Sequence, residues 1–180
     1  MSAAAFSSRS RSGRVDAGHL RRNDTSPPEA PNFAILLGPF LRAVSRESTP
    51  RFLALLERAA AERYRWWAAE WPARAVALND CADREDEIAD RIERLFEVSS
   101  EAAAQLTSSL PAALKVYADV FTALPIREQL RIQADAERQG AAAWRGISSQ
   151  SEDETVREEL ERCALLEEET ADQVESLLCP

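Results

Sequence analysis

Hydrophobic residues recur at helical spacing through most of this chain after residue 48. The first such segment begins at Thr49, an N-cap residue followed by Pro50 at the first helical position, and it stops before Pro72. Its apolar side chains share one helical face: Phe52, Leu55, Leu56, Ala59, Trp66 and Ala69. The pattern therefore predicts a helix over residues 49–71.

Three more helical segments follow the first. Residues 73–97 carry a second apolar stripe, and residues 125–146 carry a third that Gly146 ends. A fourth begins after Ser151, a residue placed to cap it, and runs to about Leu178. Residues 98–124, with a short helical stretch from Leu110, are too long for a hairpin turn and predict a crossover.

The apolar faces of the predicted helices also indicate where several individual side chains lie. Large aromatic residues at helical spacing are more often core or interface anchors than ligand contacts. We therefore expect Trp66 in the core, Trp67 at an interface and Tyr64 on the polar side of its helix. Cys81 and Cys163 are expected to be small buried hydrophobes that do not bridge each other.

Composition supports an all-α domain. Only 5 of the 180 residues are glycine, and Ala, Leu, Glu and Arg dominate after residue 40, which favours helix over strand. With 45% hydrophobic and 29% charged residues, the chain lies near the average of globular proteins. One domain with its own core is therefore expected.

Charge and cysteine usage limit the partners and the cellular location that we expect. Residues 1–22 carry five Arg and one Asp within a total net charge of −9, so the remainder is strongly acidic and argues against a nucleic-acid partner. The longest apolar stretch, 33–41, is too short to span a membrane. Three cysteines without a C-x-x-C pair, and no secretory signal, favour a cytoplasmic location.

The sequence divides into three parts. Residues 1–31 are rich in Ser and Arg and predict a flexible tail, residues 32–48 a short accessory helix and linker, and residues 49–180 a helical bundle. An Arg-rich, Ser-rich segment is also typical of an organelle transit peptide. That alternative applies to residues 1–22, which lack an evident amphipathic face.

The helical segments repeat. Residues 78–96 match residues 160–178 at an offset of 82, with nine of nineteen positions identical, including Cys81/Cys163 and Glu85/Glu167. The first and third helices agree at an offset of 75: Pro50/Pro125, Leu55/Leu130, Ala59/Ala134, Ala61/Ala136, Glu62/Glu137 and Arg63/Arg138. The unit is interpreted as a helical hairpin that was duplicated and joined by the crossover.

Each helix carries one glutamate on or beside its apolar face. Glu85 and Glu167 lie at the centres of their stripes, Glu137 lies on the apolar face of the third helix, and Glu62 lies toward one side of the first. Burying ionised carboxylates is costly, so four buried carboxylates require compensation by a metal, by arginine partners, by water or by protonation. The alternative is four solvated flank positions, but their equivalence in the repeat favours a shared interior.

With these residues, positions 49–178 resemble the ferritin-like superfamily, particularly its rubrerythrin-like branch. The resemblance implies a four-helix bundle of two helical hairpins with a long crossover. Its di-metal site would use one Glu from each of two helices, here Glu62 and Glu137, and Glu-x-x-His from the other two, here Glu85 and Glu167. The histidines are missing, because Ile88 and Thr170 stand in their places.

The missing histidines weaken the expected metal site. An all-carboxylate cage suits hard ions better than iron, and Arg63 or Arg138 is expected to neutralise the carboxylates instead. We expect a degenerate di-metal site without a resident cofactor, in a non-enzymatic binding or accessory protein. The alternative is a di-iron or di-manganese metalloprotein that oxidises iron or reduces peroxide, so enzyme status stays open. A homodimer is expected, with no nucleic acid or membrane partner.

Overall fold

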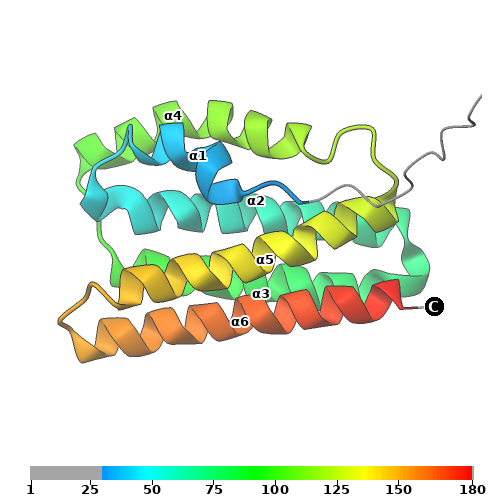
Figure 1. The fold of residues 1–180 in the computed structure, drawn as a ribbon. Coiled ribbons are helices and arrows are strands. Elements are labelled where there is room, and N and C mark those ends of the chain that lie inside the picture. The colour runs from blue at the N-terminus through cyan, green and yellow to red at the C-terminus, as the bar shows by residue number, and fades with distance from the viewer. Residues whose placement is uncertain (1–29, 180) are drawn as a thin grey trace, which may run out of the picture.

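The computed structural model describes residues 30–179, and all regular structure in that range is helical (Figure 1). The six α-helices are α1 (Phe33–Leu41), α2 (Thr49–Glu70), α3 (Ala75–Leu95), α4 (Ser100–Asp119), α5 (Ile126–Ser148) and α6 (Glu154–Leu178). Short 3₁₀ turns, Arg46–Ser48 and Pro72–Arg74, precede α2 and α3. The all-α prediction is confirmed, whereas the proposed tail and transit segment lie almost wholly outside the described residues.

Two antiparallel helix pairs form the body of the molecule. Helix α2 packs along α3, α5 packs along α6, and α3 and α6 join the pairs. Helix α4 carries the chain from the end of α3 to the start of α5, and α1 lies against α4 and α5 (Figure 1). Within the described range, no helix is long and apolar enough to cross a membrane.

Several helix ends differ from the sequence prediction. The crossover contains one long helix, α4, and the exposed Pro111 lies inside it, where the carbonyl it leaves unbonded can be hydrated. Helix α5 continues past Gly146 to Ser148. Asp153 rather than Ser151 caps α6, because its side chain accepts the N–H of Val156 at 3.3 Å.

The inward face of α2 also differs from the predicted one. Tyr64 and Trp67 are fully buried, whereas Trp66 is 51% exposed, so all three expectations for these residues are wrong. Helix α2 packs on α3 and also contacts α4, and Leu55 belongs to the apolar cluster that includes residues of α4. The sequence pattern merged these two apolar sides into one face.

The structure redefines the repeat between α2 and α5. For α3 and α6 the offset of 82 holds, because Cys81/Cys163 and Glu85/Glu167 are all buried. For α2 and α5 the buried positions correspond at an offset of 80 rather than 75. The corresponding pairs include the buried Ala54/Ala134, Ala61/Ala141 and Tyr64/Trp144, and also Glu57/Glu137, in which Glu57 is half-buried.

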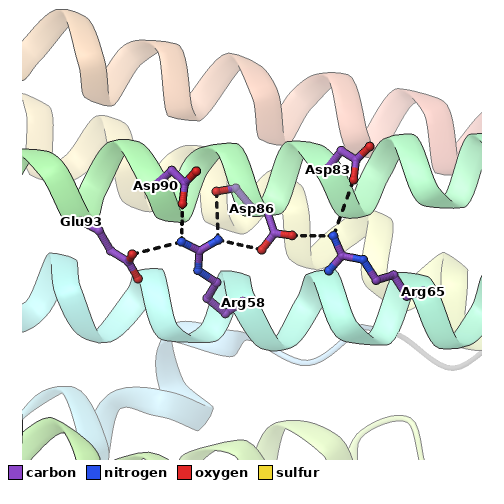
Figure 2. A network of polar contacts seen from close by, with 6 residues as sticks. All are labelled: Arg58, Arg65, Asp83, Asp86, Asp90 and Glu93. Carbon is purple, nitrogen blue, oxygen red and sulfur yellow. Dashed lines mark hydrogen bonds and ion pairs between the residues drawn. The ribbon is translucent and has the colours of Figure 1, made fainter.

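Ion pairs join α2 to α3 in a continuous network (Figure 2). The guanidinium of Arg58 contacts Asp86 at 2.8 Å and Glu93 at 3.0 Å, and it also pairs with Asp90. Arg65, two turns further along α2, contacts Asp86 at 2.5 Å. One face of the hairpin is therefore held by arginines of α2 and carboxylates of α3.

The second hairpin repeats this network. Arg138 contacts Asp172 at 2.9 Å and Glu175 at 2.8 Å, and Arg145 contacts Glu168 at 2.6 Å. Each of these contacts corresponds to one in the first hairpin when α5 is shifted by 80 residues and α6 by 82. The shared contacts support the duplication of the hairpin and the offset of 80.

Candidate metal centre

Three glutamates from three helices meet inside the bundle. Carboxylate oxygens of Glu57 on α2, Glu85 on α3 and Glu167 on α6 lie within 4.8 Å of one another. Glu85 and Glu167 are 0% and 1% exposed, and Glu57 is half-buried. The equivalence of Glu85 and Glu167 in the repeat puts them at the same level of the bundle.

Glu137 of α5 adjoins this group and is the buried equivalent of Glu57. Its Oε1 accepts a hydrogen bond from the hydroxyl of Tyr64 at 2.6 Å and another from Nε2 of Gln133 at 2.7 Å. Each long helix of the two hairpins therefore contributes one carboxylate, and we call Glu57, Glu85, Glu137 and Glu167 the glutamate cluster.

Glu62 does not belong to the cluster, contrary to its predicted interior position. It is exposed and lines a shallow groove between α2 and α4. Five residues correspond to about 140° around a helix, so Glu57 and Glu62 cannot face the same neighbour. Glu57, Glu62 and Glu137 are each followed by arginine. The Glu-Arg dipeptide therefore does not show which glutamate of α2 is equivalent to Glu137.

Several cluster oxygens lack a partner. Among residues 30–179, both oxygens of Glu85 and Oε2 of Glu167 are buried without a hydrogen-bond partner, whereas Oε1 of Glu167 accepts from the indole N–H of Trp144 at 3.0 Å. Buried polar atoms nearly always have partners, and an exception points to an ion or water. The glutamate cluster therefore has free acceptor capacity at its centre.

The two positions of the missing histidines supply no replacement ligand. Ile88 is fully buried in an apolar cluster. Thr170 is also fully buried, and its hydroxyl accepts a hydrogen bond from Nε of Arg84 at 3.0 Å. The donor atoms that the cluster can offer to a metal are therefore carboxylate oxygens.

The predicted arginine partners do not neutralise the cluster. Arg138 faces outward to its surface ion pairs, and the guanidinium of Arg63 lies 4.1 Å from the ring centre of Phe121 and 4.8 Å from that of Tyr117. The positive charge of Arg84 acts on the pKa of Glu85, but the guanidinium bonds to Thr170 and Gln173. Between residues 30 and 179, no ion pair includes a cluster carboxylate, so the predicted pairing is wrong.

Burial and mutual repulsion make the carboxyl groups weak acids. Burial, together with the charge of Glu137, raises the pKa of Glu57 to about 8. The same causes hold the pKa of Glu85 and of Glu167 well above the usual range. Burial also raises the pKa of Glu137, although hydrogen bonds from Tyr64 and Gln133 oppose the shift. Without a cation, the glutamate cluster therefore retains protons at neutral pH.

Small residues make room for these side chains. A Cβ atom at Gly140 of α5 would lie 2.5 Å from Oε1 and 2.8 Å from Cδ of Glu167. Cys81 and Cys163, each one turn before a cluster glutamate, are fully buried free thiols, as predicted. Burial raises the pKa of both thiols to about 12, so they are protonated and inert.

Comparisons with protein-family models, with curated proteins and with solved structures find no match to this chain. Oxygen-only ligand sets suit hard divalent cations such as Mg²⁺, Mn²⁺ and Ca²⁺. A cation at the centre would accept the unpartnered oxygens and replace the retained protons.

Proposed function

We propose that this protein is a metal-binding four-helix bundle of the ferritin-like type, whose site for hard divalent cations consists of carboxylates alone. The observation that carries the proposal is the glutamate cluster. Carboxylate oxygens of Glu57, Glu85 and Glu167 lie within 4.8 Å of one another, and among residues 30–179 no ion pair includes a carboxylate of the cluster. Removing several carboxylates from water without a compensating charge is costly. A divalent cation would compensate this cost directly.

The repeat supports the ferritin-like assignment. That family uses one glutamate from each helix of two hairpins that are joined by a long crossover. Here Glu57 and Glu137 correspond at an offset of 80, and Glu85 and Glu167 at an offset of 82. With Glu57 in place of Glu62, all four candidate ligands occupy equivalent, inward positions.

The ligand set indicates which ions to test first. Without an imidazole, the site favours Mn²⁺ or Mg²⁺ over iron or zinc. A bound cation supplies positive charge and Lewis acidity to whatever reaches it. The protein side chains fix its position: Trp144 orients Glu167, and Tyr64 with Gln133 orients Glu137.

A titration of the EDTA-treated protein with Mn²⁺ tests the proposal. At about 100 times the dissociation constant, binding adds about 2.7 kcal/mol to the free energy of unfolding, which corresponds to a rise of roughly 5–10 °C in Tm. Glu57→Gln and Glu85→Gln should each abolish most of this rise. Glu62→Gln is the matched control on the same helix and should retain it.

Two results would contradict the proposal. Identical melting curves with EDTA and with Mn²⁺ for the natural protein would leave the glutamate cluster as a protonated remnant in an accessory protein. In that case, replacing Glu85 and Glu167 together by Leu should be neutral or stabilising. Loss of the Mn²⁺ effect in Glu62→Gln, but not in Glu57→Gln, would show that the wrong residues had been assigned.

A further inference from the structure

A cavity of about 260 Å³ leads from the surface to the glutamate cluster. Its lining includes Glu57, Glu137 and Glu167 of the glutamate cluster. The remaining wall is mainly apolar and comes from α1, α2, α4 and α5, with Phe33, Leu37 and Leu56 among its buried members. At its rim lie the exposed residues Ala34 of α1 and Ala143 of α5.

Helix α1 is held in place as one wall of this cavity. The side chain of Asn32 caps it by accepting the N–H of Ile35 at 3.0 Å. Gln139 of α5 bonds the chain on both sides of this cap: its Oε1 accepts the N–H of Phe33 at 2.8 Å, and its Nε2 donates to the carbonyl of Pro31 at 3.0 Å. The cavity is therefore bounded by fixed elements rather than by a loose end of the chain.

We infer that this cavity binds a small, uncharged aliphatic molecule with one oxygen-donor head group, which meets the metal at the glutamate cluster. The inference rests on the proposed function, because the metal gives the head group its partner. Apolar walls with a few polar groups at one end are typical of small-molecule sites, and the polar end fixes the orientation of the ligand. Here the charged residues of the lining are Glu57, Glu137 and Glu167 of the glutamate cluster, and the head group is placed beside them.

Charge selects the kind of head group. The carboxylates consume the positive charge of the cation, so a second anion such as a fatty acid gains little attraction and meets repulsion from Glu57, Glu137 and Glu167. An ammonium group would compete with the metal for the same oxygens. A neutral hydroxyl oxygen avoids both penalties and is an accepted ligand of hard cations.

The cavity volume limits the size of the ligand. If each non-hydrogen atom needs about 30 Å³, the share of a water molecule in the liquid, the seven such atoms of 1-hexanol need about 210 Å³. This is within the 260 Å³ available. We therefore choose 1-hexanol as the probe, with hexanoate and hexylamine as charged analogues of the same length.

Paramagnetic relaxation of 1-hexanol protons by bound Mn²⁺ provides the test. Binding of Mn²⁺ is first established by electron paramagnetic resonance, so that failure of the proposed function is seen separately. The expected result is a relaxation enhancement that is largest at the carbon bearing the hydroxyl and smallest at the methyl end. Protein loaded with Mg²⁺ should give no enhancement, because Mg²⁺ is diamagnetic.

Variants at the rim test whether the ligand uses this cavity. Ala143→Leu, alone or with Ala34→Leu, should weaken 1-hexanol binding roughly tenfold while Mn²⁺ binding is kept. Ala142→Leu is the matched control, because Ala142 is exposed on the same helix but does not line the cavity. Equal relaxation in all variants, no relaxation despite bound Mn²⁺, or tighter binding of hexanoate or hexylamine would overturn the inference.

Discussion

Gly140 sets how closely α5 approaches the carboxylate of Glu167. A methyl group there would lie 2.5 Å from Oε1 of Glu167, whereas a Cβ at Gly146 of the same helix would meet nothing within 4 Å. The two glycines are thus in the same helix but in opposite environments. Only the first is required by the geometry of the glutamate cluster.

Replacing each glycine by alanine should separate stability from metal binding. Gly146→Ala should raise the free energy of unfolding by roughly 0.5–1 kcal/mol, because alanine is the better helix former, and leave Mn²⁺ affinity unchanged. Gly140→Ala should lower Mn²⁺ affinity by roughly tenfold, because the carboxylate of Glu167 must move and loses its bond to Trp144. Mn²⁺ titration and urea unfolding measure both effects. Unchanged Mn²⁺ affinity in Gly140→Ala would exclude Glu167 as a ligand.

At the scale of helices, the two hairpins differ in the number of ion pairs that one arginine forms with the neighbouring helix. Arg58 joins α2 to three carboxylates of α3, whereas Arg138 joins α5 to two carboxylates of α6. Although burial opposes the shift, hydrogen bonds from Arg58 and Arg65 lower the pKa of Asp86. The network is therefore complete at neutral pH and is lost when the carboxylates are protonated.

Arg58→Ala should accordingly destabilise the protein more than Arg138→Ala does. Exposed ion pairs contribute about 0–1 kcal/mol each, so we expect about 1 kcal/mol for Arg58 and roughly half of that for Arg138 in urea unfolding at pH 7. Both losses should shrink in 1 M NaCl because salt screens the charges. Because the folded-state pKa of Asp86 is depressed, its contribution should disappear as pH falls below about 4. Equal effects of Arg58→Ala at pH 7 and pH 3 would contradict this explanation.

For the whole molecule, the glutamate cluster should make the free energy of unfolding fall as pH rises. The stability added by a bound metal should instead increase with pH. The pKa values of its carboxyl groups are raised in the folded state, to about 8 for Glu57. The folded protein then binds more protons than the unfolded chain between about pH 4.5 and 8, so the free energy of unfolding falls as pH rises through this window. Tyr64, which donates a hydrogen bond to Glu137, stays neutral there, because burial raises its pKa well above the usual value.

Urea unfolding at pH 5, 6.5 and 8 checks this prediction. With EDTA, the free energy of unfolding should decrease across the series, whereas with Mn²⁺ the added stability should increase, because metal ligands must be deprotonated. Glu57→Gln should flatten the EDTA series, and Glu62→Gln should leave it as in the natural protein. A rise of stability with pH in EDTA would contradict the retention of protons by the cluster.

The sequence by itself determined much of this protein. It determined the all-α class, the four long helices, their pairing as hairpins and the offset of 82 between α3 and α6. It also determined that Glu85, Glu137 and Glu167 lie inside. These features follow from local signals, since each of α3, α5 and α6 has one dominant apolar stripe and a glutamate at or near its centre.

Only the tertiary structure decided the inward face of α2 and the fourth member of the glutamate cluster. Between α2 and α5, an offset of 75 gives the six identities found from the sequence, and an offset of 80 gives six others: Arg51/Arg131, Ala54/Ala134, Glu57/Glu137, Arg58/Arg138, Ala61/Ala141 and Arg65/Arg145. Because α2 contacts α3 and also α4, its apolar residues occupy two sides of the helix. Hydrophobic periodicity therefore cannot show which side faces the centre of the bundle. Burial of Tyr64 and Trp67 turns Glu57 toward the interior and Glu62 toward solvent. No local sequence pattern shows which of the two glutamates faces inward.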